Sequence, residues 1–137
     1  MGNAVRKDAG PGPALRVFLV EDSPIIRERL EEMLASIEGA RTVGCAAAAD
    51  EAIRNILDAR PDVVVLDIRL AQGSGFDVLR ALRERTPEID VYMLSNFATE
   101  PYRRLAQRLG ATEFFDKSTQ FQAVREALAR RAAATLS

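Results

Sequence analysis

The chain has 137 residues, of which 47% are hydrophobic and 28% charged, and its formal net charge is −1. This length fits one domain with an apolar core, and the balanced charge argues against direct nucleic acid binding. The sequence contains no histidine and one cysteine, which excludes Ser-His-Asp catalysis, histidine-ligated zinc and an internal disulfide. The single cysteine fits a reducing, cytoplasmic setting, and no apolar run approaches the roughly 20 residues that span a membrane.

The first half of the chain predicts two strands, each followed by a helix. Residues 1–14 are rich in glycine and proline and are expected to form a flexible leader. The apolar run 15–20 predicts a strand, and Ser23, followed by a proline, predicts the start of a helix. A weaker strand is expected at 42–46, and a helix capped by Asp50 is expected after it.

The second half repeats this alternation three times. The β-branched run 63–66 is typical of a central strand buried on both faces, and further strands are expected at 90–94 and 112–115. Helices are expected after each strand, the last two capped by Thr99 and Thr119. Five successive β–α units predict a parallel α/β sheet with helices on both faces, and such sheets bind ligands at the carboxyl ends of their strands.

Polar side chains stand at those carboxyl ends. Glu21 and Asp22 follow the first strand, Asp67 the third, Ser95 the fourth and Lys117 the fifth. Carboxylates brought to about 4 Å repel by roughly 4 kcal/mol at an effective dielectric constant of about 20, so the site needs positive charge. Lys117 supplies one charge, and Mg²⁺ suits an oxygen-rich site that also holds phosphate. The pattern therefore indicates phosphoryl chemistry.

Four short motifs carry a family resemblance. They are Val-Glu-Asp-Ser at 20–23, Val-Val-Leu-Asp at 64–67, Met-Leu-Ser at 93–95 and Phe-Phe-Asp-Lys at 114–117. In this order, each at the end of its strand, they resemble the receiver domains of two-component response regulators over roughly residues 15–129. The resemblance implies a doubly wound (βα)5 flavodoxin-like sandwich, with a five-stranded parallel sheet in the order 2-1-3-4-5.

The resemblance also implies roles in phosphoryl transfer. Asp67 would be the nucleophile that becomes an aspartyl phosphate, and Ser95 and Lys117 would contact the phosphoryl group. Phe114 falls at the position of the switch aromatic, whose ring turns inward in the family as Ser95 moves toward the phosphoryl group. Taken singly, Ser95 is as well explained as a turn hydroxyl, Lys117 as a surface lysine and Phe114 as part of the core.

The same resemblance implies a magnesium site. Asp22 and Asp67, with the backbone carbonyl of Arg69, would bind Mg²⁺ directly, and Glu21 would act through a water on the metal. The alternative for Glu21 and Asp22 is a solvated loop that precedes a helix, whereas an acid such as Asp67 rarely ends an apolar strand without a partner.

The expected function is a signalling switch that turns over no separate substrate. A histidine kinase or phosphotransfer protein would phosphorylate Asp67, and the output would be an unknown downstream protein or self-association through the last two β–α units. Residues 15–131 would form the receiver and 132–137 a short tail, which leaves no room for an output domain. We expect no membrane partner.

Four alternatives remain open. The chain could be the receiver fragment of a larger regulator, or a pseudo-receiver that only binds. A phosphatase of the haloacid dehalogenase type would need a second aspartate two residues after Asp67, where Arg69 stands. An FMN-binding flavodoxin would need a phosphate loop where Glu21 and Asp22 place two acids.

The sequence departs from the family pattern near the expected site. Ala71 and Ser118 stand where many receivers carry proline, and Asn96 stands where a small residue is usual. Without proline, a cis peptide bond before residue 118 is disfavoured. Arg69 and Phe97 are expected to flank the path of the hydrolytic water, and since Phe97 cannot orient a water by hydrogen bonding, we predict slow self-dephosphorylation.

Overall fold

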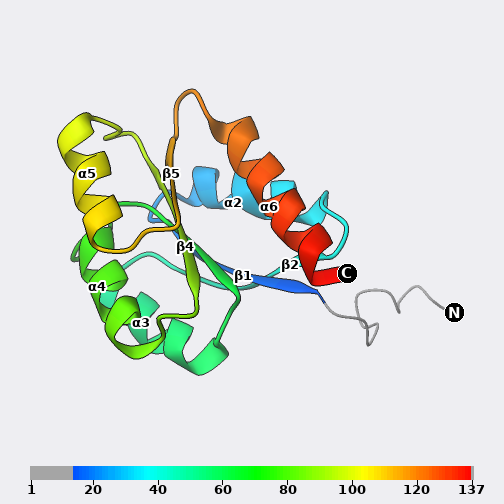
Figure 1. Ribbon diagram of the computed structural model, residues 1–137, viewed down its shortest axis with the longest axis horizontal. Coiled ribbons are helices and arrows are strands. Elements are labelled where there is room, and N and C mark those ends of the chain that lie inside the picture. Colours follow the sequence, from blue (N-terminus) through cyan, green and yellow to red (C-terminus); the bar gives the residue numbers. More distant parts are fainter. Residues whose placement is uncertain (1–13, 137) are drawn as a thin grey trace, which may run out of the picture.

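A five-stranded parallel sheet forms the centre of the molecule in the computed structural model, which describes residues 14–136 (Figure 1). Its strands are β1 (Leu15–Val20), β2 (Ala40–Ala46), β3 (Val63–Leu66), β4 (Asp90–Ser95) and β5 (Glu113–Asp116). They lie in the order β2-β1-β3-β4-β5, which confirms the expected order. Because the direction of winding reverses between β1 and β3, the carboxyl ends of these two strands flank a crevice where ligands bind in such folds.

Five helices cover both faces of the sheet. They are α2 (Pro24–Ala35), α3 (Ala49–Ala59), α4 (Gly75–Arg85), α5 (Glu100–Arg108) and α6 (Phe121–Leu136). Helices α2 and α6 lie on one face, and α3, α4 and α5 lie on the other (Figure 1). The doubly wound α/β architecture predicted from the alternation of elements is therefore confirmed.

The two faces of the sheet pack into two separate apolar clusters. Successive side chains of a strand point to opposite faces, so Phe18 packs in the cluster of α3 and α4, while Leu19 packs in the cluster of α2 and α6. Full burial of a side chain of this size contributes about 2 kcal/mol. In the second cluster, Tyr92 of β4 meets Phe115 of β5 edge to face at 6.1 Å. These clusters hold the strand ends in fixed positions.

The first two helices begin differently. Ser23 caps α2 as predicted, because its Oγ accepts a hydrogen bond from the Ile26 N–H at 3.3 Å. The predicted cap of α3 is wrong. That helix begins at Ala49, so Asp50 lies inside the first turn. There its carboxylate still faces the positive end of the helix dipole, which is the physical reason an acid is favoured at either position.

The last helix also differs from expectation. It begins at Phe121, which leaves Gln120 rather than the predicted Thr119 next to its first turn. It extends to Leu136, through most of the expected tail at 132–137, because Ala132 continues the buried stripe against the sheet.

The expected leader, residues 1–14, lies outside the described residues except for Ala14. The division of the chain into leader, receiver and tail therefore stays a prediction. Within residues 14–136, no helix has both the length and the apolar character that crossing a membrane requires.

Candidate functional site

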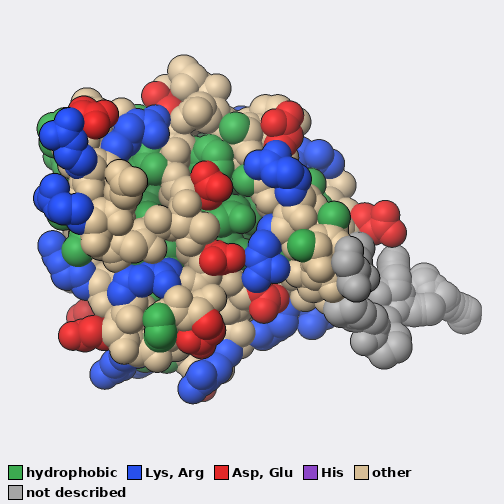
Figure 2. Space-filling view, in the orientation of Figure 1, with side chains coloured by type: hydrophobic (Ala, Val, Ile, Leu, Met, Phe, Trp, Pro, Cys, Tyr) green, Lys and Arg blue, Asp and Glu red, His purple; other side chains and the backbone are tan. Residues whose placement is uncertain are grey.

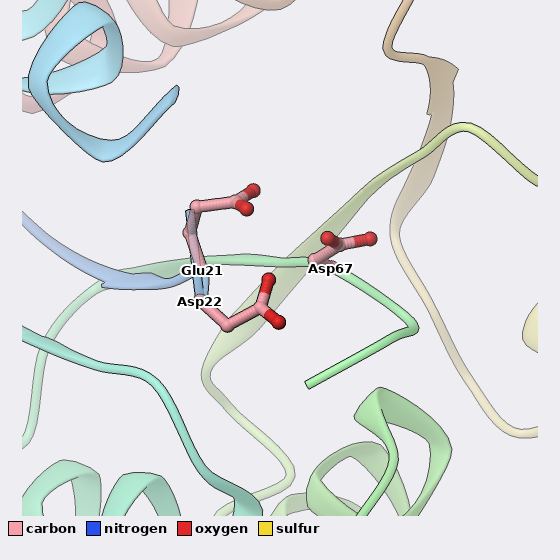
Figure 3. Close-up of side chains that lie close together, drawn as sticks. All are labelled: Glu21, Asp22 and Asp67. Atoms are coloured by element: carbon pink, nitrogen blue, oxygen red, sulfur yellow. The ribbon is translucent and has the colours of Figure 1, made fainter. Parts of the chain in front are cut away.

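Three carboxylates lie together at the carboxyl ends of β1 and β3. Glu21 and Asp22 directly follow β1, and Asp67 directly follows β3. One carboxylate oxygen of each residue lies within 4.8 Å of the others, and both Glu21 and Asp22 extend toward Asp67 (Figure 3). Glu21 and Asp67 are buried, whereas Asp22 is exposed. The structure thus brings together the three acids that were predicted to meet.

Lys117 balances the charge of the two buried acids. It follows β5, and its Nζ donates hydrogen bonds to Glu21 Oε1 at 2.9 Å and to Asp67 Oδ2 at 2.8 Å. The Lys117 side chain is 9% exposed, and those of Glu21 and Asp67 are 2% and 8% exposed. Because β4 separates β5 from β3, the lysine side chain reaches across the end of β4 to form this bridge.

The electrostatics of Glu21 and Lys117 are coupled. Burial raises the pKa of Glu21, and the hydrogen bond from Lys117 only partly offsets this. Burial alone would lower the pKa of Lys117, but hydrogen bonds to Asp67 and Glu21 raise it overall. Lys117 therefore stabilises the fold at neutral pH, and this is lost only as the pH rises through its raised pKa. The raised pKa of Glu21 gives the same direction of pH dependence: the folded state binds this proton more tightly, so stability falls as the pH rises through the raised pKa of Glu21, and the ionised carboxylate is a cost at neutral pH.

The donor atoms of the acidic cluster fit a magnesium ion. All are carboxylate oxygens, the ligands that Mg²⁺ prefers, and opposite ligands of an octahedral Mg²⁺ stand about 4 Å apart. The carboxylate oxygens, one from each of the three acids, lie within 4.8 Å of one another, a separation close to that spacing between ligands. Arg69, predicted to offer its backbone carbonyl, lines the same cavity as the acids. Asp67 Oδ1 is fixed by a 2.7 Å hydrogen bond from the Ile68 N–H, so the carboxylate has a defined orientation.

Ser95 and Phe114, the two predicted switch residues, lie outside the acidic cluster: Ser95 ends β4, whereas Phe114 lies within β5, level with Met93. Ser95 is fully buried, and its Oγ accepts a hydrogen bond from the Phe97 N–H at 3.0 Å. The hydroxyl therefore faces its own loop. Phe114 is half-buried on β5, and the Arg103 guanidinium lies 4.9 Å from the centre of its ring. A contact of Ser95 with a phosphoryl group would require its hydroxyl to turn.

A cavity of about 560 Å³ opens above the acids, and its wall includes Arg69 and Phe97. The Arg69 guanidinium lies 5.2 Å from the centre of the Phe97 ring, a cation–π arrangement. The Phe97 ring in turn contacts Tyr102 at 6.0 Å, and Tyr102 stacks on Phe76 at 6.2 Å. A continuous row of side chains thus runs from the cavity to the exposed surface of α5, where Tyr102 is 40% exposed.

Gly75 shapes the site, although the sequence indicated only a loop there. It is the first residue of α4, and its N–H donates to the Ile68 carbonyl at 2.8 Å. A Cβ at this position would lie 2.1 Å from the backbone oxygen of Asp67, closer than any nonbonded contact allows. Only glycine therefore lets α4 approach the end of β3. The signal in the sequence was the Gly-Ser-Gly triplet at 73–75.

The loop after Lys117 is held by polar contacts. Asp116 Oδ1 accepts hydrogen bonds from the Ser118 N–H at 2.9 Å and from the Ser118 hydroxyl at 2.7 Å. These bonds lower the pKa of the Asp116 carboxyl. Residues 14–136 contain no cis peptide bond, which agrees with the expectation for a serine at position 118.

Comparisons with known proteins agree on one family. The family model of the response regulator receiver domain matches residues 17–129. A protein-glutamate methylesterase/protein-glutamine glutaminase of Geobacter sulfurreducens is 34% identical over 106 residues, which are 77% of this chain and 28% of that protein. The DNA-binding transcriptional activator DevR/DosR of Mycobacterium tuberculosis is 33% identical over 75% of this chain and 48% of its own length. The chain therefore spans at most about half of these relatives.

A solved structure is also similar. The crystal structure of the CheX–CheY–BeF3–Mg complex from Borrelia burgdorferi contains a chain that matches with a TM-score of 0.75 and 25% identity. The match covers 88% of this chain and 92% of that one.

Proposed function

The chain belongs to the response regulator receiver domain family, and from this membership and the geometry of its acidic site we propose that Asp67 is the residue that takes up a phosphoryl group. The observation that carries the proposal is the environment of Asp67. Its carboxylate is buried at the end of β3, is paired with Lys117 at 2.8 Å, and has Glu21 and Asp22 beside it. A buried carboxylate with an adjacent lysine and two further acids suits in-line phosphoryl transfer, which depends on positioning and charge stabilisation.

The proposed reaction is a nucleophilic displacement at phosphorus. A carboxylate oxygen of Asp67 forms a bond to phosphorus, and the bond from phosphorus to the donor breaks with its electron pair remaining on the donor. The Nζ of Lys117 lies 2.8 Å from Asp67 Oδ2, which is close enough for it to donate a hydrogen bond to an oxygen of a phosphoryl group on Asp67. Ser95 would turn its hydroxyl from the Phe97 N–H to another phosphoryl oxygen.

We further propose Mg²⁺ as the cofactor. Asp22, Asp67 and the backbone carbonyl of Arg69 would hold the ion, and Glu21 would contact it through water. The ion would supply positive charge close to the phosphoryl oxygens. Support comes from the oxygen-only donor set and from the exposure of Asp22, which leaves one side of the cluster open to solvent.

We propose a histidine kinase or a phosphotransfer protein as the donor, and a protein as the partner on the output side. Figure 2 shows basic and acidic side chains mixed over the visible face of the molecule, as the net charge of −1 suggests, and this supports a protein partner over nucleic acid. Self-association would use the last two β–α units. The chain covers only a receiver domain, and a separate catalytic activity like that of the methylesterase relative is not part of the proposal.

Phosphorylation of Asp67 is tested by intact mass after incubation with acetyl phosphate. We expect the wild type to gain one phosphoryl group in Mg²⁺ and none in EDTA, because the metal offsets the charge of the acids and the phosphate. Asp67→Asn should gain none in either buffer, since an amide is not a nucleophile of this kind. A phosphoryl group on Asp67→Asn, or a wild type that gains none from acetyl phosphate and from a panel of histidine kinases, would contradict the proposal.

The lifetime of the phosphorylated state is expected to depend on Phe97. Its apolar ring, with Arg69 stacked on it, lines the wall above Asp67 and offers no group to orient a water. In Phe97→Glu a carboxylate could accept a hydrogen bond from the attacking water, so we expect hydrolysis to be faster by about tenfold or more. The half-life is measured by intact mass after removal of the donor. Phe97→Leu, which removes the ring but adds no polar group, is the control, and a wild-type half-life no longer than that of Phe97→Glu would disprove the idea.

A further inference from the structure

Gln120 holds the chain segment that carries Lys117. The Asp116 N–H donates a hydrogen bond to Gln120 Oε1 at 2.7 Å, and the Gln120 N–H donates to the Asp116 carbonyl at 2.8 Å. The two residues are therefore joined in both directions across the turn that contains Lys117. On the other side, the Lys117 N–H donates to the Ser95 carbonyl at 2.9 Å. The backbone at Lys117 is thus fixed between β4 and the start of α6.

Arg103 holds Gln120 from the neighbouring helix. Its Nη2 donates to Gln120 Oε1 at 3.4 Å, so this oxygen accepts two hydrogen bonds. The same guanidinium donates to the carbonyls of Ala98 at 3.2 Å and Phe114 at 3.3 Å. Arg103 of α5 therefore connects the loop after β4, strand β5 and the turn that carries Lys117.

A lysine needs such support if it is to act at a fixed point. Its side chain is a flexible four-carbon stem, so the position of its Nζ depends on how firmly its backbone is held. Lys117 must reach both Glu21 and Asp67 across the end of β4, and it does so at 2.9 and 2.8 Å. A displacement of about 1 Å in a group that takes part in catalysis costs up to about a hundredfold in rate.

We propose that Gln120, held by Arg103, is a positioning residue that keeps Lys117 at the acidic cluster. Gln120 does not contact Asp67 and acts only through the Lys117 segment. The consequence for phosphoryl transfer rests on the proposed function, whereas the position of Lys117 can be measured without it.

The chain offers a direct chemical probe of that position. Its two lysines are Lys7 and Lys117, so acylation by the N-hydroxysuccinimide ester of acetic acid can be followed at each by peptide mass spectrometry, with Lys7 as the reference in the same molecule. We expect Gln120→Met to make Lys117 react about tenfold faster, because an amine released from Glu21 and Asp67 becomes accessible. Gln120→Glu keeps the accepting oxygen and the attraction to Arg103, so it should react like the wild type.

Arg103→Met tests whether Arg103 acts through Gln120. It should increase acylation of Lys117 by a smaller factor of about threefold, and the double variant should react no faster than Gln120→Met alone, because the two residues act as one unit. The matched control is Arg104→Met, since Arg104 lies on the same helix and, among the described residues, its ion pair is with exposed Glu100, at 3.3 Å. Urea unfolding of each variant separates a loss of overall stability from a local change.

Phosphoryl uptake from acetyl phosphate in Mg²⁺ is the second readout. We expect it to be about tenfold slower in Gln120→Met and near the wild-type rate in Gln120→Glu and Arg104→Met. Equal acylation of Lys117 in the wild type and in folded Gln120→Met would overturn the inference whatever happens in the uptake assay. A wild type that takes up no phosphoryl group from acetyl phosphate or from a panel of histidine kinases, with Lys117 exposed in Gln120→Met, would instead contradict the proposed function and leave the positioning role supported.

Discussion

Replacing Lys117 by methionine is expected to lower the free energy of unfolding by about 3 kcal/mol at pH 7 in EDTA. The substitution keeps much of the apolar stem but leaves Glu21 and Asp67 buried beside each other without positive charge. Breaking a buried ion pair by removing one partner is costly because the remaining charge has lost both water and its partner. The measurement is urea unfolding followed by circular dichroism. Saturating Mg²⁺ should restore part of the loss, since a cation that binds only the folded state stabilises it.

Two comparisons isolate the cause of that loss. Arg80→Met removes a charge from an ion pair with Asp77 whose side chains are 55% exposed, and it should change stability by less than about 0.5 kcal/mol. Adding Glu21→Gln to Lys117→Met should recover stability, because the raised pKa of Glu21 shows that its ionised form is unfavourable in the fold. If Lys117→Met proves as stable as the wild type in EDTA, the two acids do not depend on Lys117 for charge balance.

Gly75→Ala is expected to destabilise the protein by about 3 kcal/mol and to slow phosphoryl uptake at Asp67. The added Cβ would stand 2.1 Å from the Asp67 carbonyl oxygen and 3.0 Å from the Ile68 Cα. Both are backbone atoms, so no side chain can move aside, and α4 and the end of β3 must separate. Overpacking in a closely packed interior costs about 1–3 kcal/mol, and here the displaced segment carries the proposed nucleophile.

The control for Gly75→Ala is Glu100→Ala. Glu100 is likewise the first residue of a helix, α5, but its side chain is exposed, so alanine there should cost about 0.5 kcal/mol. Stability is measured by urea unfolding, and uptake by intact mass with acetyl phosphate and Mg²⁺. A Gly75→Ala protein with the stability and uptake rate of the Glu100→Ala control would show that α4 can move from β3 at no cost.

Much of the fold and the acidic cluster could be predicted because both follow from local patterns. Apolar runs marked the strands, and the alternation of strands and helices required a parallel sheet. Once the sheet is parallel, residues that end its strands share one edge, so Asp22, Asp67 and Lys117 converge although they are far apart in the sequence. The family motifs supplied the strand order, which the alternation alone leaves open.

The remaining features depend on contacts that no local pattern encodes. The hydroxyl of Ser95 faces the Phe97 N–H because the loop after β4 turns back on itself. Arg69 stacks on Phe97 only because two separate loops meet above the cavity. Gln120 lies three residues after Lys117 in the sequence like any polar loop residue, and its proposed role becomes visible only when Arg103 reaches it from α5.

The row of rings from the cavity to α5 gives the protein a built-in optical probe. The chain has no tryptophan and two tyrosines, so its near-ultraviolet emission comes from Tyr92 and Tyr102. Tyr92 lies in the core of the opposite face, against Phe115, whereas the Tyr102 ring lies 6.0 Å from that of Phe97, a residue that lines the cavity. With Tyr92 changed to phenylalanine, the tyrosine emission of the unlabelled protein would come from Tyr102 alone and report on its surroundings between Phe97 and Phe76.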